Sequence, residues 1–129
     1  MLDLDPLRPS HRPCLLVADD EPVIREIVRT MAESAGFEVA TCCDAREALC
    51  VADRLGSALD AVLLDLHMPG MHPGVVTALA ARAPSVRIML MTGDIASATH
   101  GFACHGLLCK PFTGAELRSA LTPAWQVAA

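Results

Sequence analysis

The stretch LLVADDEP, residues 15–22, places three acidic side chains directly after a run of apolar residues. Asp19, Asp20 and Glu21 follow a segment whose composition is typical of a buried strand. Like charges that are crowded or buried cost free energy unless a cation or a hydrogen-bond donor compensates them. The sequence therefore predicts a positive partner for these carboxylates.

Three more reactive side chains stand where later strand-like runs end. Asp65 ends the run DAVLLD, Thr92 lies at the end of VRIMLMTG, and Lys110 follows LLC. Carboxylate oxygens are the ligands that Mg²⁺ prefers, and Mg²⁺ would relieve the repulsion among the acids. A carboxylate beside the ion can attack a phosphoryl group, while a lysine and a hydroxyl stabilise the transferring oxygens. These residue types predict a phosphoryl-transfer site.

The apolar pattern predicts the elements that position these residues. Strand-like runs cover residues 14–18, 37–42, 60–65, 86–93 and 107–109, and helical patterns cover 22–35, 44–55, 74–84, 94–106 (weakly) and 113–122. Five strands alternating with five helices predict a parallel sheet with helices on both faces, a doubly wound α/β fold. Ligands bind such sheets at the carboxyl ends of the strands, where the polar residues named above fall.

Local signals mark the ends of several of these helices. Asp44 with Glu47, and Thr113 with Glu116, have the spacing of capping boxes, in which each side chain accepts from the other residue's backbone N–H. Gly56 follows the second helix and is expected to end it.

Length, composition and charge exclude several classes of protein. The chain has 129 residues, 53% of them hydrophobic, which is enough for the core of one domain. Its net charge of −5 and its 3% aromatic content argue against a nucleic-acid surface. The start of the chain lacks the features of a signal peptide, and no apolar run approaches membrane-spanning length. We therefore expect a cytoplasmic protein without nucleic-acid or membrane partners.

The six cysteines are expected to be reduced and to pack as small apolar residues. Cys104, His105 and Cys109 lie close together in the sequence, but they lack the paired C-x-x-C spacing of a zinc site.

The motifs VADDEP, LLDLHMPGM, MTG and CKPF resemble those of the receiver domain of two-component response regulators, the CheY-like family. The resemblance implies a flavodoxin-like, five-stranded parallel sheet with strand order 2-1-3-4-5. It places the receiver domain at residues 14–122, between tails at 1–13 and 123–129.

The resemblance also implies a role for each polar residue. Asp65 matches the phosphoacceptor, Thr92 the hydroxyl that responds to phosphorylation, and Lys110 the lysine that pairs with the phosphate, in a Lys-Pro bond implied to be cis. The implied cofactor is Mg²⁺, and its implied ligands are Asp19, Asp20, Asp65 and the backbone carbonyl of His67.

Three features depart from the family pattern. His72, Pro73 and Gly74 stand where an acidic residue and a glycine are common, and the segment between Thr92 and Lys110 is short. Leu107 replaces the usual Tyr or Phe, which lies outward or inward according to the state of the site. We therefore expect the backbone of residues 93–105 to carry the signal, with Leu107 as a passive core residue.

The resemblance predicts a stand-alone receiver that accepts a phosphoryl group on Asp65. The donor would be a phosphohistidine on a sensor histidine kinase or a histidine phosphotransfer protein, and phosphorylation would change binding to a downstream protein partner. Such a protein is a signalling domain rather than an enzyme, because it catalyses only its own phosphorylation and dephosphorylation. Because the chain contains no output domain, direct control of transcription is not expected.

Two alternatives belong to other classes of protein. A haloacid-dehalogenase-like phosphatase would need a D-x-D pattern after its first strand and usually a cap domain, and neither is visible in the sequence. A receiver-shaped binding module that does not use phosphorylation stays open. Partner binding that is indifferent to Asp65→Asn would favour this module.

Overall fold

The strands form one parallel sheet in residues 12–94 and 102–122, the part of the chain that the computed structural model describes. They are β1 (Cys14–Ala18), β2 (Glu38–Cys42), β3 (Ala61–Asp65), β4 (Arg87–Thr92) and β5 (Gly106–Cys109). Their order in the sheet is β2-β1-β3-β4-β5, which confirms the predicted doubly wound fold. β3 is buried along its whole length, as expected of a central parallel strand covered on both faces.

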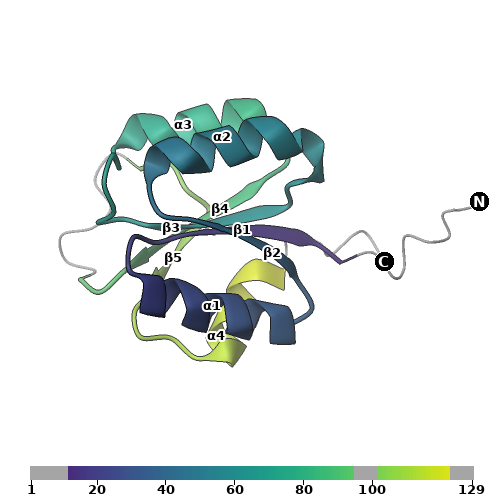
Figure 1. The fold of residues 1–129 in the computed structure, drawn as a ribbon, viewed down its shortest axis with the longest axis vertical. Coiled ribbons are helices and arrows are strands. Elements are labelled where there is room, and N and C mark those ends of the chain that lie inside the picture. Colours follow the sequence, from purple (N-terminus) through teal and green to yellow (C-terminus); the bar gives the residue numbers. More distant parts are fainter. Residues whose placement is uncertain (1–11, 95–101, 123–129) are drawn as a thin grey trace, which may run out of the picture.

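Helices cover the two faces of the sheet in pairs (Figure 1). The helices α2 (Ala45–Leu55) and α3 (Pro73–Arg82) lie on one face, and α1 (Pro22–Ser34) and α4 (Gly114–Leu121) lie on the other. A short 3₁₀ turn, η2 (Gly56–Ala58), follows α2. Successive strand residues point to opposite faces, so Leu15 and Val17 join the core beside α1, and Leu16 and Ala18 join the core beside α2.

The two predicted capping boxes differ in the structure. The box at Thr113 is complete, because its hydroxyl accepts from the Glu116 N–H and the Glu116 carboxylate accepts from the Thr113 N–H. Asp44 caps α2 by accepting from the Glu47 N–H at 2.8 Å. The Glu47 carboxylate, however, accepts from Cys43 N–H at 2.9 Å, so the second half of the predicted box is wrong. The chain leaves β2 after Cys42, and the Cys43 N–H beyond the strand takes this acceptor.

The helix predicted over residues 94–106 is not formed at its carboxyl end. Residues 95–101 lie outside the described residues, residues 102–105 are not helical, and β5 already begins at Gly106. His105 runs alongside β4 because its N–H donates to the Ile88 carbonyl at 2.8 Å and its Nδ1 accepts from the Ile88 N–H at 2.9 Å. These two bonds tie the chain to β4 just before β5 begins.

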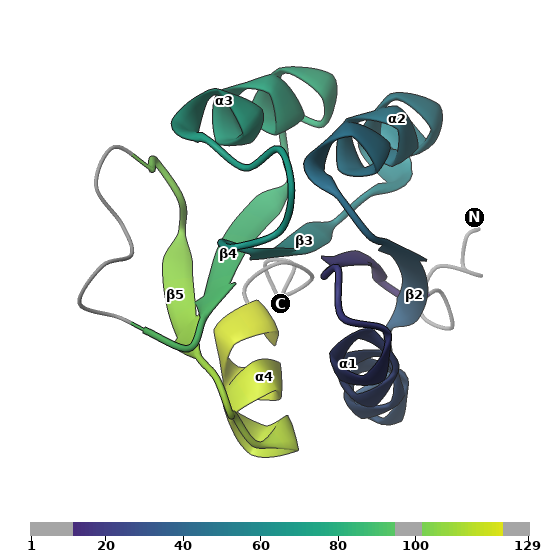
Figure 2. The same cartoon turned by 60° about the vertical axis from the view of Figure 1, so that its left-hand side comes forward.

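The edge strand β5 pairs with β4 (Figure 2). Leu107, in β5, is half-buried and packs against the core on the α2 and α3 side. The expected movement of residues 93–105 lies largely outside the described residues and stays a prediction. None of the helices in the described ranges has the length and apolar character needed to cross a bilayer.

Candidate acidic site at the carboxyl end of the sheet

The register of the central strands brings two acids together. Ala18 of β1 pairs with Leu64 of β3, so Asp19 and Asp65 follow side by side at the carboxyl edge. This is where the strand order changes direction, since β2 lies on one side of β1 and β3 on the other. Asp19 is fully buried and Asp65 is 4% exposed, so both carboxylates are largely withdrawn from water.

The third predicted metal ligand, Asp20, completes a cluster with these two. Carboxylate oxygens of Asp19, Asp20 and Asp65 lie within 4.8 Å of one another. Asp20 is exposed, so the cluster opens to solvent on its side. Three hard oxygen donors at this spacing fit a divalent cation such as Mg²⁺.

Backbone and side-chain bonds fix the loop that carries Asp19. One Asp19 carboxylate oxygen accepts from the Glu21 N–H at 3.0 Å. The Asp19 carbonyl accepts from Nη1 of Arg25, in α1, at 2.7 Å. Arg25 therefore anchors the β1–α1 loop from the first turns of the following helix, a contact that the sequence analysis did not identify.

Lys110 supplies the positive partner that the acidic run predicted. Its Nζ lies 2.8 Å from Oδ2 of Asp19 and 3.6 Å from Oδ1 of Asp65. Its backbone N–H donates to the Thr92 carbonyl at 2.7 Å, which ties it to the end of β4. The peptide bond between Lys110 and Pro111 is cis, as the resemblance implied.

The pKa of the Lys110 amine is raised. Burial acts to lower it, but the hydrogen bond to Asp19 and the negative charges of Asp65, Asp19 and Glu21 outweigh that effect. The amine is therefore held in its charged form.

The pKa of Asp65 is raised in spite of this lysine. Burial is the largest cause; the His67 backbone N–H and the charge of Lys110 act to lower it, and Asp19 and Asp20 raise it further. The Lys110 amine alone therefore does not offset burial and the neighbouring acids, and the ionised form of Asp65 stays less stable than it is in water. Additional positive charge at the site would stabilise the ionised carboxylate.

Thr92 lies fully buried at the end of β4 and contacts the side chain of His67, a residue for which the sequence analysis predicted only a role of the backbone carbonyl. Its Oγ1 is 3.2 Å from Nε2 of His67. The His67 backbone N–H also donates to Oδ1 of Asp65 at 3.1 Å. Its position two residues after the strand-ending Asp65, next to β4, was the available signal. The predicted role of its carbonyl as a metal ligand stays a prediction.

His72, one of the departures from the family pattern, has a structural role. It is the N-cap of α3, and its Nδ1 accepts from the Gly74 N–H at 3.1 Å. A Cβ at position 74 would lie 2.8 Å from the His72 ring, so glycine permits this cap. His72 and Gly74 form the start of the helix, and His72 is not among the residues that the acidic site brings together.

The cysteines show no disulfide, and their thiols differ in environment. All six are free. Burial and nearby acids raise the pKa of Cys42 to about 12, whereas Cys50 and Cys109 are exposed. Cys104 donates to the Gly106 carbonyl and His105 bonds Ile88, so these two residues have partners within the fold.

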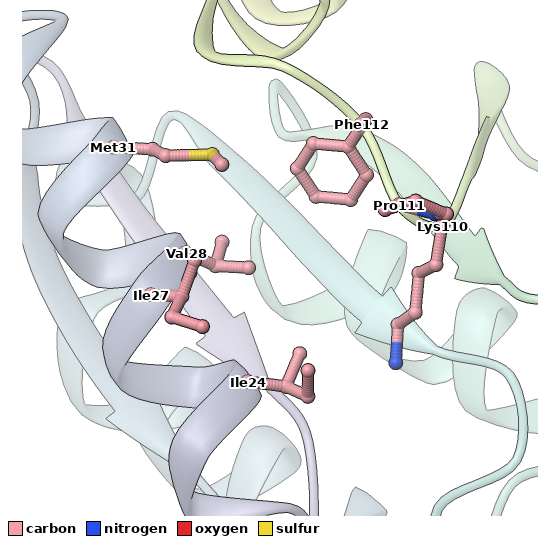
Figure 3. A pocket seen from close by; sticks show the side chains of 7 residues that line it. All are labelled: Ile24, Ile27, Val28, Met31, Lys110, Pro111 and Phe112. Carbon is pink, nitrogen blue, oxygen red and sulfur yellow. The ribbon is translucent and has the colours of Figure 1, made fainter.

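An apolar groove of about 350 Å³ adjoins the acidic site (Figure 3). One wall is α1, and the other is the segment that follows β5; the lining residues are Ile24, Ile27, Val28, Met31, Lys110, Pro111 and Phe112. Lys110 thus borders the groove and also reaches Asp19 with its amine. On the same helix, Val23 is 71% exposed and Ile27 is 48% exposed.

The fold and site together define a doubly wound α/β protein with an acidic cluster and a lysine at its topological switch point. The family model that matches the chain is the response regulator receiver domain, over residues 15–122. The chain belongs to this family.

Similar proteins support the same assignment. The transcriptional regulatory protein AruR of Pseudomonas aeruginosa is 33% identical over 114 residues, which cover 83% of this chain and 47% of AruR. The chain thus spans about half the length of this relative. The chemotaxis response regulator CheY4 of Vibrio cholerae is 27% identical with a TM-score of 0.77, and the match covers 88% of this chain and 99% of CheY4.

A third similar protein is a response regulator from Burkholderia pseudomallei. Its crystal structure contains a phosphorylated aspartic acid, a calcium ion and citrate. It is 26% identical with a TM-score of 0.75, and the match covers 87% of this chain and 68% of that one.

Proposed function

We propose that Asp65 accepts a phosphoryl group from a protein phosphohistidine and that the phosphorylated domain binds a downstream protein differently. An Asp65 oxygen forms the new bond to phosphorus while the bond from phosphorus to the imidazole nitrogen breaks, and that nitrogen keeps the electron pair. The observation that carries the proposal is the Lys110 amine beside both buried acids, 2.8 Å from Asp19 and 3.6 Å from Asp65.

The remaining residues have complementary roles. The residues that would hold Mg²⁺ are Asp19, Asp20, Asp65 and the carbonyl of His67, and the raised pKa of Asp65 supports a need for added positive charge. When bound, the ion neutralises charge on the transferring oxygens. Lys110 pairs with a phosphoryl oxygen, and the Thr92 hydroxyl donates to another.

The apolar groove is the proposed docking face for the donor protein. A donor must bring its histidine to Asp65 at the carboxyl edge of the sheet, and the groove is continuous with the site through Lys110. The exposed Val23 and Ile27 widen this face beyond the groove. Its occupant would be an apolar surface of a sensor histidine kinase or a histidine phosphotransfer protein, since receiver domains interact with such kinases.

The output is a protein partner whose affinity changes on phosphorylation. AruR is named as a transcriptional regulatory protein, so the comparisons do not support the expectation that nucleic acid is excluded as a partner. The domain modifies itself and carries a signal, in keeping with its family.

Intact mass spectrometry tests the proposal. The protein is incubated with phosphoramidate, whose P–N bond resembles that of phosphohistidine, with and without Mg²⁺. We expect one phosphoryl adduct that requires both Mg²⁺ and Asp65. An adduct that persists in Asp65→Asn would refute the proposal, and partner binding unchanged by that substitution would favour the phosphorylation-independent module.

Introducing a negative charge into the groove tests the docking face. Ile27→Glu should slow phosphotransfer from a phosphorylated kinase or phosphotransfer protein at least tenfold, while leaving the reaction with phosphoramidate unchanged. Thr77→Glu, on the exposed side of α3, is the matched control. If Ile27→Glu and Thr77→Glu slowed phosphotransfer equally, the groove would not be the docking face for the donor protein.

A further inference from the structure

The Thr92 hydroxyl has a full set of contacts in the structure. A hydroxyl carries one hydrogen and two lone pairs. Oγ1 accepts from the Asp94 N–H at 3.0 Å, lies 3.2 Å from the Asp94 carbonyl, and lies 3.2 Å from Nε2 of His67. The single hydrogen is already engaged by the Asp94 carbonyl or by the His67 ring, so Thr92 must give up that contact before its hydroxyl donates to anything else.

Two proton arrangements are compatible with the contact between Thr92 and His67, and they differ in whether the Asp94 carbonyl receives the hydroxyl hydrogen. In one, the hydroxyl donates to the Asp94 carbonyl and the His67 ring N–H donates to Oγ1; in the other, the hydroxyl donates to the His67 ring nitrogen. Both include a bond between Thr92 and His67. If Oγ1 moves away from the ring toward Asp65, that bond is lost in either arrangement.

His67 therefore contacts both the proposed phosphoacceptor, Asp65, and the hydroxyl of Thr92. Its backbone N–H donates to Asp65 at the end of β3, and its ring contacts Thr92 at the end of β4. Thr92 in turn holds Asp94, where the chain leaves β4 toward β5. The contacts link the turn after β3 to the segment after β4.

We propose that the His67 side chain is a positioning residue that latches the Thr92 hydroxyl in the unphosphorylated protein and thereby opposes the phosphorylated conformation. This rests on the proposed function in that Thr92 is to donate to the phosphoryl group. A contact present in one conformation and absent from the other shifts the equilibrium by its own free energy. A hydrogen bond of ordinary net strength corresponds to about a fivefold shift.

The latch itself is tested in the unphosphorylated protein, without any phosphoryl group. Urea unfolding of wild type, His67→Phe, Thr92→Val and the double variant forms a double-mutant cycle. We expect the unfolding constants to show a coupling of about fivefold between the two positions. Purely additive effects would overturn the latch, whatever the outcome for the proposed function.

The second experiment measures the affinity for beryllium fluoride, a phosphoryl analogue, in the presence of Mg²⁺. His67→Phe should bind it about fivefold more tightly than wild type, because the latch no longer holds the resting state. His67→Gln, whose amide reaches as far as Nε2, should restore the wild-type affinity. In a Thr92→Val background, His67→Phe should have no effect.

The results separate the two proposals. Unchanged or weaker binding by His67→Phe, or a gain that survives Thr92→Val, would refute the latch. Wild-type protein whose response to beryllium fluoride is the same as that of Asp65→Asn would instead refute the proposed function, and the unfolding cycle alone would then decide on the latch.

Discussion

Asp60 and Asp65 flank the two ends of β3, and their carboxylates have different surroundings. Asp60 stands just before the strand, and its Oδ2 accepts from the Cys14 N–H at 2.7 Å, a bond that joins the starts of β3 and β1. Asp65 ends the strand, nearly buried beside Asp19 and Lys110, and its pKa is raised. One acid completes the backbone ladder, whereas the other is crowded by like charges.

Two histidines show the same difference between the two ends of the neighbouring strand, β4. His105 accepts from the Ile88 N–H near the start of β4 and extends the pairing of β4 with β5. His67 contacts the Thr92 hydroxyl at the end of β4. The Asp60 and His105 side chains at the amino edge are thus paired with backbone groups, whereas those at the carboxyl edge also contact one another. Chemistry is expected at the second edge because its groups can change partners without unpairing the sheet.

The largest expected effect is the loss of reactivity in Lys110→Met. Removing a donor aimed at transferring oxygens typically lowers a rate by about 10²–10³-fold, and we expect phosphorylation by phosphoramidate to slow by that factor. The rate of mass gain measures it. Arg118→Met, which removes an exposed positive charge on α4, is the control and should react like wild type.

Replacing His105 should change stability without changing chemistry. In His105→Leu the nearly buried Ile88 N–H loses its acceptor, so the free energy of unfolding should fall by about 2 kcal/mol. His105→Asn offers an amide oxygen close to the position of Nδ1 and should recover most of that loss. Urea denaturation measures both. A slower phosphorylation rate in folded His105→Leu would contradict the assignment of a purely structural role to the amino edge of the sheet.

Asp20→Asn should weaken Mg²⁺ binding about tenfold, because it removes a carboxylate from the cluster. Mg²⁺ at 100 times its dissociation constant should stabilise wild type by about 2.7 kcal/mol through mass action. Thermal melts across a Mg²⁺ titration measure the shift. Asp53→Asn, which removes an acid paired with Arg82 away from the site, should titrate like wild type. Identical titrations of all three proteins would contradict a metal site at Asp20.

The smallest expected effect is a pH-dependent gain in stability in Asp65→Asn without divalent ions. Because folding raises the pKa of Asp65, its contribution to stability is full below the ordinary value of 3.8 and is lost as the pH rises through the folded value. The asparagine variant should therefore be more stable than wild type at neutral pH, and the gain should vanish in acid. Chemical unfolding at several pH values compares the variant with wild type, and a gain that persists in acid would contradict this assignment.

The strands, and the polar residues at their carboxyl ends, were predictable from short patterns in the sequence. Apolar runs predicted all five strands to within one residue at each end, and the acids after β1 and β3 followed from those ends. Lys110 was predicted as a phosphate partner, and the structure places its amine against Asp19 and Asp65. These inferences succeed because a parallel sheet aligns its carboxyl ends whatever the details of the loops.

Contacts that depend on side-chain direction were not predictable. Glu47 accepts from Cys43 instead of closing its capping box, a choice made by the path of the chain after β2. His67 and Thr92 are 25 positions apart, and only the pairing of β3 with β4 brings them together. The end of the predicted helix over 94–106 was wrong because His105 bonds to β4, a partner that helical periodicity does not reveal.

Chemical mapping of the phosphorylated residue tests the central claim most directly. Sodium borohydride reduces an acyl phosphate to an alcohol, so a phosphorylated aspartate becomes homoserine. After reaction with phosphoramidate, peptide fragmentation between Arg54 and Arg82 reads Asp60 and Asp65 in the same peptide. We predict homoserine at position 65, dependent on Mg²⁺, and unchanged aspartate at position 60. Homoserine at Asp19 or Asp20, or at no position, would contradict the account.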